Sequence, residues 1–477
     1  MMEIPCGMQE QFLEAKELIE SSNDIKIYTH TDCDGICSGA ILSIILDRLN
    51  KDYEIEFVNL DEIEDLDLDH KLTIFSDLGS GQGVDKNAKD GQKILILDHH
   101  PPLRDINYKN DKAYTYLEIN PMFYGIDGSY YVCGGGLCYF LAKTFGFKDL
   151  SWIGVLSAIG DMQNNKTGHF EGLNEIIQED AINEGLLKVT KNDLNIYGRS
   201  TRPLYVALSY FSDVKLPITN NQQEAKVVLE ELGVDEKHNR KTLSEVTEED
   251  KMEIKKFLSR MISKRVPPKY LKYVPKLIVG DAYTFLNEEE GSFLRDGSEF
   301  STAMNACGRN RKEAIGVDII KGDRLVALDA LEEVSKTHKY NLATSISKVA
   351  DNYHSEIIEL DNFQYFDCSD FDEDIASNII GTITGMVLGY CNWKKPILGF
   401  SKPKNNQIKV SLRCSKLLAY DGIHFGNMMR EIAKEVGGTG GGHAIACGAY
   451  IPNEKKSEFL DKFNSCLLYT SPSPRDG

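Results

Sequence analysis

Two short stretches of this sequence concentrate side chains that commonly bind metal ions. His30, Asp32 and Asp34 occupy every second position from 30 to 34, and Asp98-His99-His100 are consecutive. Imidazole nitrogens and carboxylate oxygens are ordinary ligands of divalent cations. Each stretch also has a simpler interpretation, because Asp32 or Asp34 could be a helix N-cap and residues 98–100 a polar turn that ends a strand. Neither stretch alone decides between these interpretations.

Single aspartates follow two further apolar stretches. Asp77 comes after residues 72–75, and Asp161 follows Gly160 after the strongly apolar residues 152–159. An aspartate at the end of a strand is common by itself, so either position alone is weak support for a site. Their importance depends on whether the fold brings them to the other two stretches.

The elements around these residues predict a parallel sheet. Apolar runs at 25–28, 53–58, 72–75 and 93–97 are typical of strands, and residues 36–49 carry apolar side chains at helical spacing. Alternating strands and helices form doubly wound sheets, in which ligands bind beyond the carboxyl ends of the strands. With residues 152–159 as one more strand, that edge would gather His30, Asp32, Asp34, Asp77, Asp98, His99, His100 and Asp161.

So many carboxylates in one cleft would repel one another, and most would have to take up protons. Two divalent cations would remove this conflict. The sequence therefore predicts a binuclear site, an arrangement that stabilises both the attacking and the leaving oxygen of a phosphoryl displacement.

Three glycine-containing segments also carry predictions. Residues 133–136, Cys-Gly-Gly-Gly, open a predicted helix whose N–H groups could bind phosphate, although a tight turn explains them equally well. Residues 437–442 hold five glycines in six positions before His443, which predicts a loop lying against a phosphate or nucleotide, with a flexible hinge as the alternative. Residues 293–309 predict a loop and a helix with a C-cap at Gly308.

Composition narrows the class of protein. The net charge of −19 argues against broad non-specific binding to nucleic acid. A local basic face is still open at residues 251–276, which are rich in Lys and Arg with Glu253 as the only acid, but a solvated helix explains them as well. No apolar run is long enough to span a membrane, and the N-terminus does not resemble a signal peptide. We therefore expect a cytoplasmic protein whose eleven cysteines are reduced thiols.

Taken together, the motifs resemble the DHH phosphoesterase superfamily, and within it the archaeal RecJ-like nucleases. The resemblance covers about 20–165 and 290–460. Residues 125–129 and 294–309 are similar to the archaeal RecJ branch in particular, and residues 411–413 and 440–443 are similar to the family's C-terminal DHH-associated domain. The N-terminal motifs that carry it are His30-Thr-Asp32-Cys-Asp34-Gly35, Ser76-Asp77-Leu-Gly79, Asp98-His99-His100 and Gly160-Asp161.

This resemblance implies an α/β fold with the active site in a cleft between two domains. A parallel-sheet DHH catalytic domain would occupy residues 1–190, and a mainly helical connector residues 191–345. A smaller α/β DHH-associated domain at 346–465 would bind substrate. Residues 466–477 resemble a translated sequencing adaptor, and we set them aside as an artefact.

The resemblance also implies roles for single residues. One cation would be held by His30, Asp32 and Asp77, and the second by Asp34, Asp77, His99 and Asp161, with Asp77 as the bridge. Such ligands favour Mn²⁺, with Mg²⁺ or Co²⁺ as substitutes. In the catalytic group, Asp98 would orient a ligating histidine and His100 would face the scissile phosphate. The substrate-binding residues would be Arg413, Gly441, Gly442 and His443.

The implied function is a metal-dependent, single-strand-specific exonuclease for DNA, and also for RNA, in replication or repair. The polarity 5′→3′ is favoured, single-stranded nucleic acid is the expected partner, and the GINS replication complex is a further partner that the resemblance allows. A phosphodiesterase for cyclic dinucleotides or short oligonucleotides is an alternative that uses the same site. A replisome scaffold related to RecJ is the alternative from another class, and the complete set of ligands argues against it.

Overall fold

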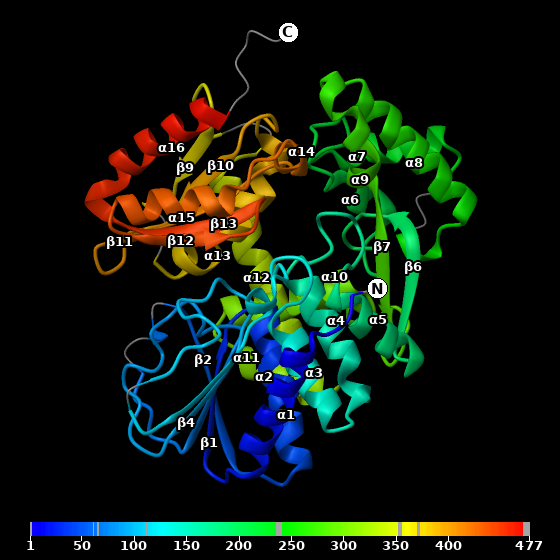
Figure 1. Ribbon diagram of the computed structural model, residues 1–477. Helices are drawn as coiled ribbons and strands as arrows, with labels where there is room; N and C mark the ends of the chain where they lie inside the picture. The colour runs from blue at the N-terminus through cyan, green and yellow to red at the C-terminus, as the bar shows by residue number, and fades with distance from the viewer. Residues whose placement is uncertain are drawn as a thin grey trace. The chain divides into compact units, whose positions relative to one another are not determined.

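The computed structural model of this chain forms two compact units, each built from two separate parts of the sequence (Figure 1). The first unit combines Met1–Asp193 with Gly280–Ser335, and the second combines Leu194–Val279 with Lys336–Gly477. The predicted connector, residues 191–345, is thus divided between the units. The structure describes residues 2–60, 62–63, 66–110, 112–234, 241–351, 355–369 and 373–470.

A parallel five-stranded sheet organises the first unit, as the sequence predicts. The strand order is β2-β1-β3-β4-β5, and every neighbouring pair is parallel. The edge strand β5 was not predicted from the sequence. The bounds are β1 (Ile25–His30), β2 (Tyr53–Val58), β3 (Leu72–Ser76), β4 (Lys93–Leu97) and β5 (Thr115–Ile119).

The sheet is buried on both faces, which explains why its central strands are almost wholly apolar. In β4, Leu95 and Leu97 pack into the core on the helical side, whereas Ile94 and Ile96 face a second cluster with Tyr28 and Phe75. The helices that enter the first core in the N-terminal part of the chain are α1 (Cys6–Glu20), α2 (Cys33–Arg48), α3 (Gly134–Thr144), α4 (Ser151–Gly160) and α5 (Leu173–Asn183).

The stretch 152–159, predicted as a strand, is instead most of helix α4. All eight residues are buried, and an apolar run of this length does not distinguish a buried helix from a buried strand. Asp161 is therefore presented by the C-terminal end of a helix.

Three later helices follow in α10 (Gly297–Arg309), α11 (Glu313–Lys321) and α12 (Val326–Val349). The predicted C-cap at Gly308 is wrong, because Gly308 lies within α10, which ends at Arg309 with Asn310 as its C-cap. Glycine is needed there for another reason. A Cβ atom on Gly308 would lie 1.7 Å from the carbonyl oxygen of Thr31, in the loop that follows β1.

The second unit contains a helical part and a mixed sheet. Its helical part has a core that includes Trp393 and Leu417 from the later part of the chain. The helices are α6 (Leu204–Ser209), α7 (Gln222–Glu231), α8 (Glu248–Ser263) and α9 (Val274–Ile278). Strands β6 (Leu187–Leu194) and β7 (Val279–Phe285) pair at the points where the chain passes from one unit to the other.

The six-stranded sheet has the order β12-β13-β11-β10-β9-β8. Only β9 and β10 are parallel neighbours. Its strands are β8 (Ile358–Glu359), β9 (Gln364–Asp367), β10 (Ile397–Phe400), β11 (Gln407–Arg413), β12 (Thr439–Gly442) and β13 (Ala446–Pro452). The accompanying helices are α13 (Glu373–Met386), α14 (Lys416–Tyr420), α15 (Phe425–Glu435) and α16 (Lys456–Thr470).

The glycine-rich segment 437–442 contains an edge strand, β12, rather than the predicted loop. The glycines do allow a close approach, but to helix α15. A Cβ atom on Gly440 would lie 2.8 Å from the carbonyl oxygen of Met429, and one on Gly426 would lie 1.8 Å from that of Gly442. Their small size therefore lets the strand pack directly against the helix.

Helix α16 packs into the core of the second unit through Phe459, Phe463 and Leu467. Helix α16 continues to Thr470, beyond the start of the segment 466–477 that we predicted as an artefact, and Leu467 is buried. Residues 471–477 of that segment lie outside the described residues.

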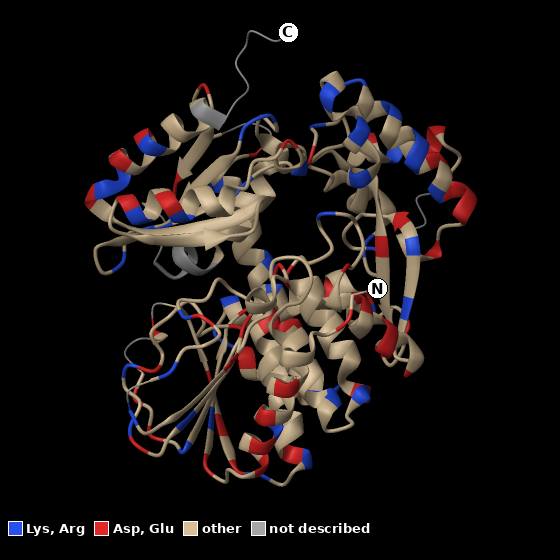
Figure 2. Ribbon diagram, in the orientation of Figure 1, with Lys and Arg blue, Asp and Glu red and all other residues tan. Residues whose placement is uncertain are grey.

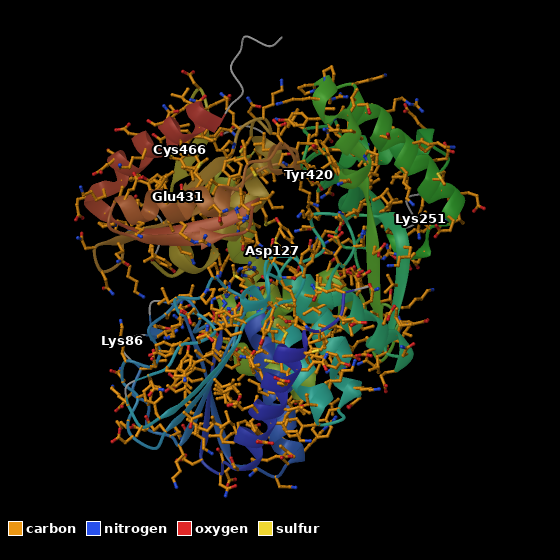
Figure 3. The ribbon with its side chains drawn as sticks, in the orientation of Figure 1. Lys86, Asp127, Lys251, Tyr420, Glu431 and Cys466 are labelled. Atoms are coloured by element: carbon orange, nitrogen blue, oxygen red, sulfur yellow. The ribbon has the colours of Figure 1, made fainter. Side chains whose placement is uncertain are left out.

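The basic stretch 251–276 keeps most of its Lys and Arg side chains exposed, and a few of its residues pack within the second unit. Lysines and arginines follow one another along α8 after an acidic first turn (Figure 2). Yet Lys251, labelled in Figure 3, is only 5% exposed and its Nζ donates to Glu248. Tyr270 is buried against Trp393, and Lys269 pairs with Asp421. Lys256, Arg260 and Arg265 are exposed, so a local nucleic-acid face and a solvated helix are both still open for this stretch.

Two expectations from composition can be compared with the structure. None of the helices in the described part of the chain is long and apolar enough to span a membrane. The eleven cysteines are all free thiols.

Candidate metal centre

The first candidate ligands sit where β1 passes into α2. His30 is the last residue of β1, Asp32 is the N-cap of α2, and Asp34 lies in its first turn. The three residues therefore span the end of a strand and the start of a helix. Asp32 is the N-cap that the sequence suggested, since Oδ1 accepts the N–H of Gly35 at 3.0 Å. Its Oδ2 lies 3.1 Å from Nδ1 of His30, next to the other candidate ligands.

Asp77 lies between two histidines. It follows β3 with a φ of 57°, a left-handed conformation that aspartate adopts more readily than most residues. Its Oδ2 is 3.5 Å from Nδ1 of His30, and its Oδ1 is 3.3 Å from Nε2 of His99. The side chain is buried, and Oδ2 has no hydrogen-bond partner among the described residues.

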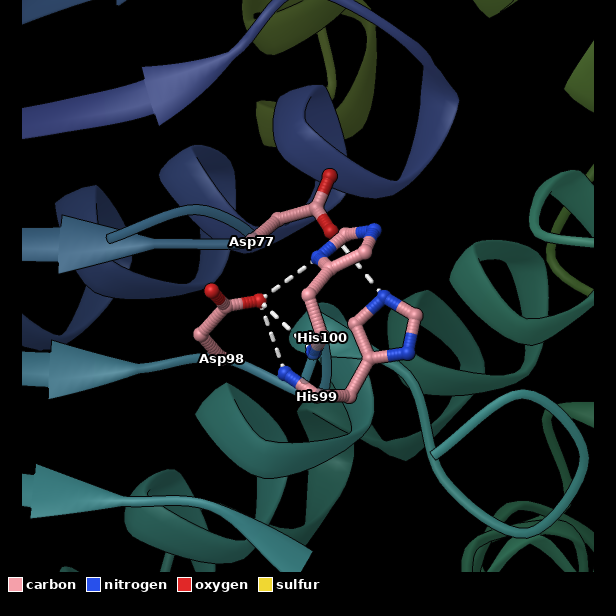
Figure 4. A group of neighbouring side chains, drawn as sticks. All are labelled: Asp77, Asp98, His99 and His100. Atoms are coloured by element: carbon pink, nitrogen blue, oxygen red, sulfur yellow. Dashed lines mark hydrogen bonds and ion pairs between the residues drawn. The ribbon is translucent and has the colours of Figure 1, made fainter. Parts of the chain in front are cut away.

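The end of β4 supplies Asp98, His99 and His100 (Figure 4). Oδ1 of Asp98 accepts the backbone N–H groups of His99 and His100 at 2.8 and 3.2 Å, and lies 2.8 Å from Nδ1 of His100. Asp98 thus holds the ring of His100. The ring of His99 is held instead by the carbonyl oxygen of Gly128, 2.7 Å from Nδ1. Asp98 therefore orients the ring of His100 and accepts the backbone N–H of His99, while Gly128 holds the ring of His99.

Asp34 and Asp161 approach His99 from the helical side. Oδ2 of Asp34 lies 3.5 Å from Nε2 of His99, and Oδ2 of Asp161 lies 3.8 Å from Nδ1. The N-terminus of α3 binds Asp34, since Gly134 and Gly135 donate their N–H groups to its carboxylate at 2.8 and 2.7 Å. These amides therefore hold a side chain of the site, and not the phosphate considered for residues 133–136.

Several supporting side chains were missed in the sequence. Gln163 donates to Gly128 O at 2.8 Å and to Asp161 at 2.6 Å, and accepts from Asn174 at 2.9 Å. From α10, Asn305 accepts the N–H of Cys33 at 3.0 Å. Gln163 could have been found by its position two residues after Asp161. Asn305 could not, because no pattern in the sequence links it to a loop about 270 residues earlier.

The electrostatics of the site favour bound protons or cations. Burial alone would lower the pKa of His30, but the carboxylates of Asp32 and Asp77 raise it well above its usual value. Burial would also lower the pKa of His99, but Asp161, Asp77 and Asp34 outweigh that effect and raise it. The pKa of Asp77 is raised by burial and then by repulsion from Asp34 and Asp32. Positive charge is thus needed in the cluster at neutral pH.

The donor set fits divalent cations. A buried carboxylate oxygen without a hydrogen-bond partner, as in Asp77, is costly unless a ligand contacts it. Three groups of candidate ligand atoms each lie within 4.8 Å of one another: His30, Asp32 and Asp77; Asp34, His99 and Asp161; Asp77, Asp98, His99 and His100.

The predicted substrate residues all belong to the second unit. Arg413 ends β11 opposite Ala446 of β13, and Gly442 of β12 lies opposite Cys447. Arg413 and the start of the His443 turn are therefore at the same end of this sheet, two strands apart. Nη1 of Arg413 donates to Leu412 O at 2.7 Å, and no carboxylate of the described side chains pairs with this guanidinium.

Comparison with known proteins identifies the parts of the chain. Residues 24–155 match the N-terminal domain of the DHH family, residues 196–274 the DHH-CID domain, and residues 361–468 the DHHA1 domain. The uncharacterised protein MJ0831 of Methanocaldococcus jannaschii is 30% identical over 451 residues, which cover 93% of each chain.

Two solved structures have the same fold. CDC45 from Entamoeba histolytica superimposes with a TM-score of 0.61 at 15% identity, over 96% of this chain and 99% of that one. RecJ from Thermus thermophilus in complex with Mn²⁺ gives a TM-score of 0.54 at 13% identity, over 99% of this chain and 56% of that one. The matched family domains, the full-length relative and the shared fold lead to one conclusion. The chain belongs to the DHH superfamily as a RecJ-like protein.

Proposed function

We propose that this protein is a two-metal phosphodiesterase that degrades single-stranded DNA, and also RNA, from an end, with 5′→3′ polarity favoured. The observation that carries the proposal is the position of Asp77. One of its oxygens faces His30 and the other faces His99, so a single buried carboxylate is shared between two groups of candidate ligands.

Two sets of side chains would hold the two ions. His30, Asp32 and Asp77 would hold the first cation, and Asp34, Asp77, His99 and Asp161 the second. Carboxylates with a few imidazoles suit Mn²⁺, with Mg²⁺ or Co²⁺ as substitutes. When bound, a pair of such ions supplies Lewis-acid chemistry for hydrolysis of a phosphodiester.

The two adjacent histidines would have different roles, one in metal binding and the other in substrate binding. The side chain of His99 is 3% exposed and is surrounded by carboxylates, whereas that of His100 is 46% exposed. Asp98 holds Nδ1 of His100, which directs the remaining nitrogen away from Asp98. His100 would therefore contact a phosphate oxygen of the substrate while His99 serves the metal.

The second unit would supply the substrate contacts. Arg413 has no carboxylate partner among the described side chains and is suited to bind a phosphate. Gly441, Gly442 and His443 would complete the contact with the substrate. We further propose a cytoplasmic protein that acts in replication or repair on single-stranded nucleic acid, and that binds the GINS complex.

Two other functions stay open to test. The same metal centre would hydrolyse cyclic dinucleotides or very short oligonucleotides, and the net charge of −19 is compatible with small substrates. A replisome scaffold would need no metal centre, so the complete set of ligands is unfavourable to it.

One assay separates these functions. Purified protein with Mn²⁺ is given single strands labelled at either end, circular single strands and cyclic di-AMP. Shortening of linear strands from one end, with circles left intact, supports the exonuclease. Cleavage of circles, or activity confined to cyclic dinucleotides and di- or trinucleotides, would overturn it. Absence of hydrolysis in every arm would favour the scaffold.

A further inference from the structure

Helix α4 contains one polar side chain that points directly at a candidate metal ligand. Ser157 is fully buried in an otherwise apolar part of α4, and its hydroxyl donates to Oδ1 of Asp34 in a short hydrogen bond. Oδ1 also accepts the N–H of Gly135. This oxygen is thus occupied by two protein donors.

The other oxygen of Asp34 has a different environment. Oδ2 accepts the N–H of Gly134 at 2.8 Å and lies 3.5 Å from Nε2 of His99. The donors on Oδ1 therefore fix the carboxylate so that Oδ2 faces His99. A rotation of the Asp34 side chain would break the bonds to Ser157 and to both glycines.

The glycines at the start of α3 make this arrangement possible. A Cβ atom on Gly135 would lie 2.1 Å from Oγ of Ser157 and 3.3 Å from Oδ1 of Asp34. One on Gly134 would lie 2.7 Å from Cβ of Asp77. Side chains at these positions would displace the hydroxyl or the carboxylate, so the glycine cluster serves the geometry of Asp34.

The orientation of Ser157 is itself determined by a neighbour. Sγ of Cys133, the residue before α3, donates to Oγ of Ser157 at 3.4 Å. A hydroxyl has one proton to donate, and with the thiol on its oxygen that proton is directed to Asp34. The chain Cys133–Ser157–Asp34 thus runs from the core towards His99.

We propose that Ser157 is a positioning residue, which sets the affinity of the second cation by holding Asp34 with Oδ2 towards His99. The proposal rests on the two-metal function proposed above. Partners that orient a metal ligand typically contribute tenfold to a hundredfold in metal affinity. We expect the removal of this hydroxyl to lower the affinity for one of the two ions and to leave the affinity for the other unchanged.

The test is a titration of the full chain with Mn²⁺. Binding is measured in two ways: by calorimetry, and by the electron paramagnetic resonance signal of the Mn²⁺ that stays free. The variants are Ser157→Ala, Ser157→Thr, Asp34→Ala and the double variant with alanine at both positions. Ser43→Ala is the matched control, because Ser43 is buried in α2 and its hydroxyl has no partner among the described residues. Thermal unfolding in EDTA confirms that each variant is folded.

The expected result is two ions in the unchanged protein and in Ser43→Ala. In Ser157→Ala one ion should bind about tenfold to a hundredfold more weakly, and Ser157→Thr, which keeps a hydroxyl, should restore part of the loss. Because Ser157 acts through Asp34, its substitution should have no further effect in the Asp34→Ala background.

If the Ser157→Ala variant is folded and its affinity for each ion is within twofold of that of the unchanged protein, the proposed role of Ser157 is wrong. So would an additive loss in the double variant, since Ser157 would then act independently of Asp34. If the unchanged protein binds fewer than two ions, the two-metal proposal fails, and the role of Ser157 fails with it.

Discussion

Replacement of Gly308 by alanine tests whether helix α10 positions the metal-binding loop. A methyl group on Gly308 would lie 1.7 Å from the carbonyl oxygen of Thr31, between the candidate ligands His30 and Asp32. A carbon and an oxygen need about 3.2–3.5 Å, so helix and loop would have to separate by roughly 1.5 Å. The neighbour is backbone, which cannot rotate away as a side chain can.

The magnitude follows from two opposing effects. Overpacking costs about 1–3 kcal/mol, and alanine favours a helix over glycine by about 1 kcal/mol. We expect a net loss of roughly 0–2 kcal/mol in the free energy of unfolding in EDTA. The larger effect should be on metal binding, because the loop moves together with His30 and Asp32. A shift of about 1 Å in a site can lower the catalytic rate a hundredfold.

The assay is urea unfolding in EDTA together with Mn²⁺ titration. Thr302→Ala is the control, since Thr302 is exposed on the same helix, and it should change stability by less than about 0.5 kcal/mol. If Gly308→Ala is as stable as the unchanged protein and binds Mn²⁺ equally well, α10 does not fix the loop, and the reasoning from this contact is wrong.

Two further predictions concern other parts of the chain. Burial would raise the pKa of Asp85, but hydrogen bonds from Tyr108, Arg104 and Tyr114 lower it to about 2. A carboxyl group whose pKa is lowered by folding stabilises the fold fully when the pH lies above its pKa in the unfolded chain. This stabilisation is lost as the pH falls from about 4 to 2. Asp85→Asn should therefore remove roughly 2 kcal/mol of pH-dependent stability in that window, and equal pH profiles for both proteins in EDTA would contradict this. Arg413→Ala should raise KM for a single-stranded oligonucleotide at least tenfold with a smaller change in kcat, and an unchanged KM would show that Arg413 does not bind substrate.

The sheet of the first unit was predictable because its strands obey simple rules. Residues 72–75 and 93–97 are apolar throughout, as strands buried on both faces are, and the aspartates and histidines that follow them come together at one edge. Residues 152–159 were not predictable in the same way, since burial on all sides makes a helix as apolar as a buried strand. Asp161 still reaches the site, from a helix end in place of a strand end.

The supporting contacts were beyond the sequence for a different reason. Ser157 is a single polar residue in an apolar run, and Asn305 reaches the site only through the packing of α10 on the loop after β1. The glycines 437–442 predicted a close approach correctly, but whether a ligand or a helix makes that approach depends on the tertiary fold. Helix α15 provides it.

The most direct test of the central claim is a count of bound Mn²⁺ in the unchanged protein and in Asp77→Asn. Asparagine keeps the size of the side chain and tolerates the left-handed backbone at this position, but it removes the charge shared by both groups of ligands. We expect two bound ions in the unchanged protein and weaker binding of both ions in Asp77→Asn. Two ions bound with unchanged affinity by Asp77→Asn would contradict this expectation.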